Sequence, residues 1–244
     1  GEAQIGQSSA SANMRQRYGL DPQWSIQRYV DGLRSRTVPD RDHESHDASS
    51  YAPQKNCENP LFAASLPDGS DTSASVLCGL ADGPRDPSLV YYLVIGGVPW
   101  QLLAQDPLNT SLPLKRTLDS TDWRRILGAS PETHQLDGID PHMIESILPR
   151  PGLPPPGASD TSDPIHGREW NTLETNAGID LQYACTFPLL QPKDCSQNPA
   201  ACDCTGLATA ADGPPLCDPN NRNVQIRGKA YPTIRELEVA KDLE

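Results

Sequence analysis

The chain has 244 residues, of which 36% are hydrophobic and 5% aromatic, and it contains 25 prolines and 18 glycines. It is long enough for one large domain or two small ones, and this composition predicts short elements joined by many loops. The formal net charge of −12 argues against nucleic acid or anionic membranes as partners.

The N-terminal part divides into a tail and the start of a folded region. Residues 1–16 are small and polar, and we expect a flexible leader there. Residues 17–244 are then expected to form a single loop-rich α/β domain. Residues 24–33 space their apolar side chains as an amphipathic helix does, and Asp21-Pro22 supplies a start signal.

Cys57 and Cys78 are the first two of seven cysteines. Their spacing makes them the natural bonding pair. The bond would close a loop of about 20 residues and stabilise the fold by about 3 kcal/mol in the loop-entropy account.

The longest apolar run is Leu89–Ile95, which combines aliphatic residues with two tyrosines and contains no charge. That composition predicts a strand, and the lack of polar alternation indicates burial on both faces. Gly96-Gly97 ends the run, and the residues that follow lack the glycine and lysine pattern of a phosphate loop. The run is too short to span a membrane. We therefore expect an α/β fold with a small sheet around strand 89–95.

Start and stop signals later in the chain predict three short helices, at residues 120–128, 140–148 and 233–243. Residues 149–164 carry many prolines, which indicates a long extended loop. Residues 180–187 favour a second strand, tethered to the following segment by Cys185.

Five cysteines fall within residues 185–217: Cys185, Cys195, Cys202, Cys204 and Cys217. Zinc sites prefer C-x₂₋₄-C pairs, whereas Cys202 and Cys204 form C-x-C and no histidine follows Cys185. We therefore predict a disulfide-rich subregion at 185–217, in which Cys202 and Cys204 reach different partners. Disulfides indicate an oxidising compartment, so we expect an exported protein. Seven is an odd number, which leaves a free thiol, an intermolecular bond or a partner outside this chain.

One group of residues could bind a divalent ion, zinc or calcium. His142 and Glu145 are spaced to share a helix face, and a second pair, His166 and Glu169, follows the proline-rich loop. Two imidazoles with a carboxylate suit such an ion. A structural interpretation explains the same residues, because Asp140 would cap a helix and Glu145 would be solvated. Both interpretations stay open.

A weaker metal candidate is the pair His43 and His46, which lies among acidic residues of a polar stretch. An acidic surface loop explains this pair equally. Nucleophilic catalysis has little support, because the chain lacks G-x-S-x-G and no cysteine stands beside an evident basic partner.

Several phrases of the sequence together resemble the later part of a family of uncharacterised exported bacterial proteins. They are Arg28–Leu33, Asn59–Phe62, Arg85–Val90, Gly96–Leu103, Asp140–Ser146, Asp180–Cys185, Pro192–Cys195, Cys202–Cys204, Pro215–Cys217 and Lys229–Leu237. The resemblance covers roughly residues 15–244 and brings no established activity. It implies an upstream von Willebrand factor A-like region and a further cysteine beyond the last helix. On that resemblance, this chain is part of a larger protein, and the odd cysteine is explained.

Three functions remain as expectations. The first is a non-catalytic exported structural or binding module, periplasmic, at the bacterial cell surface or extracellular. The second is a metal-dependent hydrolase using His142, His166 and Glu145 or Glu169. The third is the accessory half of a von Willebrand factor A-like adhesion protein. We favour the first, with a protein or the remainder of a longer parent chain as partner and no transmembrane segment.

Overall fold

The computed structural model describes residues 14, 17–18, 23–40, 56–67, 69, 73–109, 111–154, 169–170, 181–197, 202–204 and 215–244. The chain divides into two compact units. One comprises Gly1–Tyr18 and Gly96–Ile234, and the other comprises Gly19–Ile95 and Arg235–Glu244. The expected leader at 1–16 lies almost wholly outside the described residues, and the single domain at 17–244 stays a prediction.

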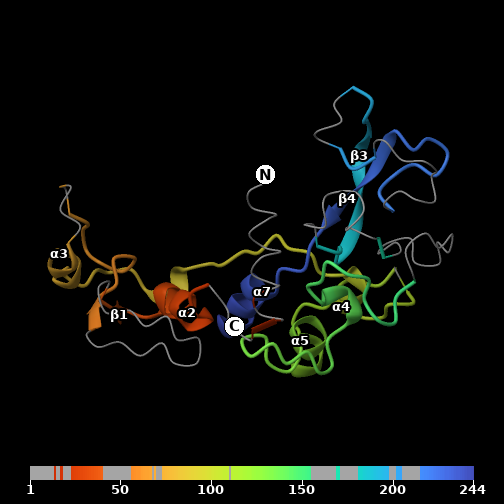
Figure 1. The fold of residues 1–244 in the computed structure, drawn as a ribbon. Helices are drawn as coiled ribbons and strands as arrows, with labels where there is room; N and C mark the ends of the chain where they lie inside the picture. The colour runs from red at the N-terminus through yellow and green to blue at the C-terminus, as the bar shows by residue number, and fades with distance from the viewer. Residues whose placement is uncertain are drawn as a thin grey trace. The chain divides into compact units, whose positions relative to one another are not determined.

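Helices and strands are both present and short, which confirms a mixed α and β composition. Figure 1 shows the elements, which are α2 (Ile26–Arg34), β1 (Thr37–Pro39), β2 (Asn56–Glu58), α3 (Ala74–Cys78), η1 (Pro87–Leu89), α4 (Trp100–Leu103), α5 (Ser120–Leu127), η2 (Pro141–Met143), β3 (Cys185–Asp194), β4 (Val224–Ala230) and α7 (Ile234–Asp242). In the described part of the chain, no helix has the length and apolar character needed to cross a membrane.

Helices α2 and α7 share the apolar core of the unit that contains both. Ile26 and Val30 of α2 pack with Val239 of α7, and all three are buried. The Arg235 guanidinium donates a hydrogen bond to the carbonyl of Trp24, just before α2. The helices predicted at 24–33 and 233–243 are therefore confirmed, and their apolar faces meet across more than 200 residues of sequence.

Strands β1 and β2 form a short antiparallel pair in the same unit, with Val38 opposite Cys57. Cys57 is buried and bonded to Cys78 at the end of α3, as the spacing of these cysteines predicted. The side-chain amide of Asn59 donates to the carbonyls of Gly32 and Ser35 at 2.9 and 2.8 Å. This residue thereby satisfies the last carbonyls of α2 and fixes the turn after β2.

The strand predicted at 89–95 is wrong. Pro87–Leu89 form a single 3₁₀ turn capped by Asp86, and residues 90–95 belong to neither of the two sheets. Burial on both faces is wrong as well, because Leu93 and Ile95 are almost fully exposed. A strand needs hydrogen-bonding neighbours as well as β propensity, and no described strand pairs with this run.

Helix α5 belongs to the unit that holds residues 96–234. The Asp119 side chain caps its N-terminus, Asp122 completes the reciprocal capping box, and Gly128 ends the helix at φ 84°. The helix buries Ile126 and Leu127. The prediction of a helix at 120–128 is confirmed.

The helix predicted at 140–148 is correct only at its start. Asp140 caps the segment by accepting from the His142 backbone N–H, but Pro141–Met143 make one 3₁₀ turn and Ile144 is already extended. His142 and Glu145 consequently do not share a helix face, because the helix that would align them is absent.

Strands β3 and β4 form an antiparallel pair, with Cys185 opposite Ala230 at one end and Asp194 opposite Val224 at the other. The register shifts between Pro188 and Lys193, where proline lacks the N–H that a continuous ladder requires. The second strand predicted at 180–187 thus begins later, at Cys185, and runs farther. The proline-rich loop at 149–164 falls mostly outside the described residues.

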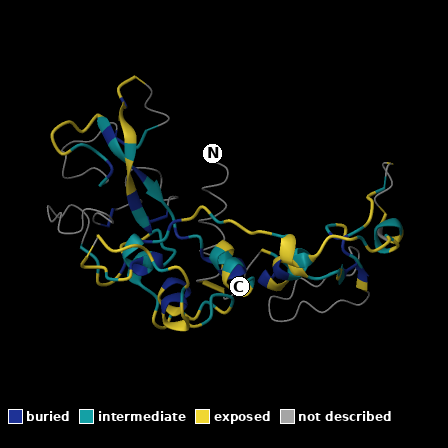
Figure 2. Cartoon of the chain, turned by 180° about the vertical axis from the view of Figure 1, so that it is seen from behind, coloured by how far each residue is buried: buried dark blue, intermediate teal, exposed yellow. Residues whose placement is uncertain are grey.

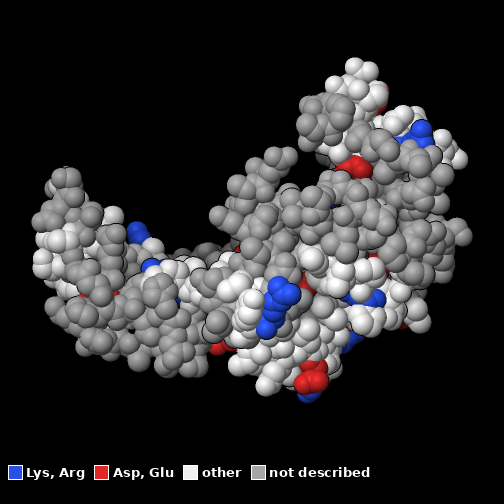
Figure 3. Space-filling model, viewed as in Figure 1, with Lys and Arg blue, Asp and Glu red and all other residues white. Residues whose placement is uncertain are grey.

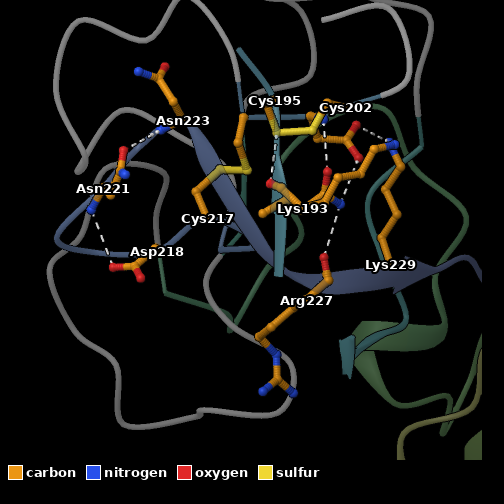
Figure 4. Close-up of a disulfide and its surroundings, with 12 residues drawn as sticks. Lys193, Cys195, Cys202, Cys217, Asp218, Asn221, Asn223, Arg227 and Lys229 are labelled. Atoms are coloured by element: carbon orange, nitrogen blue, oxygen red, sulfur yellow. Dashed lines mark hydrogen bonds and ion pairs between the residues drawn. A yellow bond between two sulfur atoms is a disulfide. The ribbon is translucent and has the colours of Figure 1, made fainter. Parts of the chain in front are cut away.

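Two disulfides lie beside β3 and β4, which confirms the disulfide-rich subregion at 185–217. Cys195 bonds Cys202, and Cys204 bonds Cys217, so the neighbours Cys202 and Cys204 do reach different partners. Figure 4 shows this region around the end of β3. The predicted tether through Cys185 is wrong, because Cys185 is a free thiol.

Candidate functional site

Among the described charged residues, Arg150 and Glu169 form a buried ion pair with many hydrogen bonds. Arg150 Nε and Nη2 donate to Glu169 Oε1 at 3.0 and 2.6 Å, and the Arg150 backbone N–H donates to Oε2 at 3.0 Å. The two side chains are 2% and 3% exposed. Both carboxylate oxygens of Glu169 are therefore used by Arg150, which gives this predicted metal ligand a structural role.

The remaining Arg150 donors connect three segments of the same unit. Nη1 donates to the carbonyls of His142 and Ile144 at 2.6 and 3.3 Å, and Nη2 donates to the carbonyl of Tyr183 at 2.5 Å. The guanidinium thus joins the end of η2 to the residues that lead into β3. Sequence analysis missed this residue, because Pro149-Arg150-Pro151 has the composition of a linker.

A second set of hydrogen bonds lies next to this ion pair. The Gln182 side-chain oxygen accepts from the Trp170 backbone N–H at 3.1 Å, and its amide nitrogen donates to the Trp170 carbonyl. The Gln182 backbone N–H in turn donates to the Ser146 carbonyl at 2.8 Å. Residues 169–170 are therefore held on both sides without belonging to any sheet.

Among the described residues, Asp140 and His142 form the pair that most resembles the carboxylate–histidine pairs of catalytic sites. His142 Nδ1 lies 2.8 Å from Asp140 Oδ1, and Arg125 Nη2 lies 3.8 Å from Oδ2. Burial acts to raise the pKa of Asp140, but hydrogen bonds from His142 and the charges of His142 and Arg125 outweigh it, and the pKa lies below its usual value. A carboxylate hydrogen-bonded to one ring nitrogen orients the imidazole.

The structure describes only some of the other predicted metal ligands. Glu145 lines a small pocket together with His134, Met143 and Ile234. His166 lies outside the described residues, as do His43 and His46. Across the described ranges, no three His, Cys, Asp or Glu side chains form a group that could hold a metal ion.

The disulfide-rich subregion has a small core of its own. Trp170, Tyr183 and Leu216 are buried against the half-cystines Cys195 and Cys204. Around this core, Lys229 forms a 2.8 Å ion pair with Asp203 and lies 5.7 and 5.5 Å from the rings of Tyr183 and Tyr231. Figure 4 shows Lys229 on β4 directed toward the disulfide region. These contacts account for the cysteine cluster as a small packed core around two disulfides, and no bound ligand is needed to explain it.

Cys185 stands apart from these bonds. It is half-buried at the start of β3, and burial raises the pKa of its thiol, with the Arg227 charge opposing the rise in part. A raised pKa keeps the group as a thiol near neutral pH, and thiols are poor nucleophiles. The geometry therefore gives no support to nucleophilic catalysis by Cys185.

No family model, curated protein or solved structure matches this chain. The resemblance to exported bacterial proteins with a von Willebrand factor A-like region stays a proposal, and function has to be argued from the residues themselves.

The surface provides one more constraint. On the face drawn in Figure 3, lysine and arginine side chains of the described residues are scattered among acidic ones and do not form one basic patch. The net charge of −12 stays the argument against nucleic acid as a partner.

Proposed function

We propose that this chain is a non-catalytic exported module with a structural or binding role at the bacterial cell surface, in the periplasm or outside the cell. The disulfide set carries the proposal. Three bonds use six of the seven cysteines, and they join residues 21, 7 and 13 positions apart. Disulfides of this kind persist in oxidising compartments and support small units whose cores are limited.

The role of the buried charges supports the same proposal. The Arg150–Glu169 pair, which includes one candidate metal ligand, connects backbone segments, and each Glu169 oxygen accepts from Arg150. In the wider proposal, the module is the accessory part of a longer chain with a von Willebrand factor A-like region, and the remainder of that chain is one partner.

The test separates disulfides from metal-bound thiolates. We expect the oxidised chain to weigh about six hydrogens less than the reduced chain under denaturing conditions, because each disulfide removes two. A reductant should unfold the region around residues 195–217, whereas a chelator should leave its circular dichroism unchanged. Unfolding by the chelator, with no mass deficit, would overturn the proposal.

One observation favours a second function, a metal-dependent hydrolase. Asp140 Oδ1 lies 2.8 Å from His142 Nδ1, and carboxylates hydrogen-bond and orient metal-binding histidines in the same way. The native mass with added zinc or calcium tests this alternative, with His142→Ala as the variant and His134→Ala as the matched histidine control. Equal metal uptake by the parent and both variants would eliminate the His142 site.

A further inference from the structure

Asn109, Thr110 and Ser111 form an N-x-[ST] triplet with no proline in its middle position. In an exported protein such a triplet is the acceptor of an N-linked glycan, which is attached to the asparagine side chain. None of the other asparagines of the sequence has serine or threonine two residues on. A triplet alone is a weak signal, so the structure around Asn109 has to support it.

The triplet lies in the loop that joins α4 to α5. Ala104 and Leu114 pair across the base of this loop in an antiparallel bridge. Between them, the exposed residues are 105, 107–109 and 111–114 (Figure 2). The loop and both helices belong to the same unit. An enzyme outside the cytoplasm can therefore reach the Asn109 side chain after this unit has folded.

A tight turn holds the Asn109 side chain. The Ser111 backbone N–H donates to Asn109 Oδ1 at 3.1 Å, and the Leu112 N–H donates to the Asn109 carbonyl at 3.2 Å. The first hydrogen bond turns the amide toward Ser111, the position at which the triplet requires a hydroxyl. It also draws electron density to Oδ1, which makes the Nδ2 protons easier to remove. Within the described residues Nδ2 itself forms no hydrogen bond, so this nitrogen is open to reaction.

The loop also exposes apolar side chains next to the triplet. Leu108 is 95% exposed, Leu114 51% and Leu112 44%. They stand on both sides of Asn109 in the sequence. Exposed apolar surface promotes association with other molecules. A glycan is bulky and solubilising, so one attached to Asn109 would screen these leucines.

We propose that Asn109 is an N-glycosylation site, which accepts an oligosaccharide from a polyprenyl-pyrophosphate-linked donor. In the transfer, Nδ2 forms a bond to the anomeric carbon of the first sugar, and the bond between that carbon and the donor's phosphate oxygen breaks. One Nδ2 proton leaves, and the polyprenyl pyrophosphate departs with the electron pair of the broken bond. The inference rests on the proposed export, because such acceptors belong to secreted proteins.

The same turn recurs in this unit without the hydroxyl. Asn221 and Asn109 each end an Asp-Pro-x-Asn sequence. The Asn223 N–H donates to Asn221 Oδ1 at 3.2 Å (Figure 4), and the Val224 N–H donates to the Asn221 carbonyl at 2.9 Å. Asn221 and Asn223 are both exposed. Asn221 therefore has the turn of Asn109, with asparagine at the position where the triplet has serine.

The test uses the folded, oxidised full chain, a purified oligosaccharyltransferase and a polyprenyl-pyrophosphate-linked oligosaccharide. The intact mass of the parent should rise by one oligosaccharide, and peptide mapping should place it at Asn109. Asn109→Gln and Ser111→Ala should each abolish the increase, whereas Ser111→Thr should keep it. Asn223→Ser completes the triplet at Asn221 and should add a second oligosaccharide. Far-ultraviolet circular dichroism should be the same for all four variants.

Asn223→Ser is also the positive control for the enzyme. Modification of Asn221 in this variant, with none at Asn109, would overturn the proposal. An unmodified parent in a reaction that glycosylates a short Asn-Ala-Thr peptide would overturn it too, as would a mass increase that persists in Asn109→Gln. The mass deficit from the disulfides is measured separately on Asn109→Gln, so the proposed export and the glycosylation site can fail independently.

Discussion

Arg150 and Glu169, nineteen residues apart, form a fully buried ion pair in which Nε and Nη2 share one carboxylate oxygen and the Arg150 backbone N–H takes the other. The same guanidinium donates to three backbone carbonyls. The positive charge of Arg150 is therefore compensated by the Glu169 carboxylate and by backbone carbonyls. A buried ion pair is stable only when its remaining donors and acceptors are satisfied in this way.

Glu169→Gln should therefore cost about 3–5 kcal/mol of unfolding free energy, because it leaves the buried Arg150 charge without its partner. Urea unfolding followed by tryptophan fluorescence measures the loss. The exposed pair Arg36–Asp82 is the control, and Asp82→Asn should cost about 1 kcal/mol or less. The double variant Arg150→Met with Glu169→Leu should recover part of the loss. Equal costs at the buried and exposed pairs would contradict this assignment.

Gly97 lies where another backbone comes too close for a side chain. A Cβ there would collide with the Tyr231 carbonyl oxygen, at the parallel bridge between Gly97 and Pro232. Gly97→Ala should be clearly destabilising, since backbone must move to admit the methyl group. Gly32→Ala in α2 should act in the opposite direction, with a gain of about 1 kcal/mol, because no atom lies within 4 Å of the new Cβ. Thermal unfolding of both variants should give melting temperatures on either side of the parent's.

Asp122 should make the free energy of unfolding depend on pH in the acidic range. The Lys115 ammonium donates to Asp122 Oδ1 at 2.5 Å, and this hydrogen bond is the main cause of a pKa below the usual 3.8. A folded-state pKa below the unfolded value contributes stability above pH 3.8, which is lost as pH falls through the lower folded value. Denaturant midpoints measured from pH 6 to pH 2 should fall less steeply in Asp122→Asn than in the parent. If the midpoints of the parent and the variant fell equally with pH, Asp122 would not be a source of the acid sensitivity.

Cys185 should be the one free thiol of the oxidised chain, and it should react slowly with alkylating agents. Burial raises the pKa of this group, so less thiolate is present near neutral pH. Alkylation of the native chain at pH 7.5 should be slower than alkylation of the unfolded, unreduced chain, and both should reach one label per chain. Rapid native labelling, or three labels, would contradict the raised pKa or the assigned disulfides.

Features that depend on neighbours along the chain could be predicted from the sequence. Helix α5 follows from the acidic cap and Gly128, because side chains within four residues satisfy the free ends of a helix. The disulfide of Cys57 with Cys78 was predictable from spacing, since a short loop brings its ends together at small entropic cost.

Features that need a partner distant in the sequence could not be predicted, because folding brings that partner into place. The 89–95 run has the composition of a core strand, yet burial depends on what packs against it, and Leu93 and Ile95 are almost fully exposed. Glu169 was a plausible metal ligand until Arg150 was found beside it. Arg150 itself, set between two prolines, carries no local signal of its role. Propensity acts between neighbours in sequence, whereas burial and ion pairing depend on segments that meet only after the chain has folded.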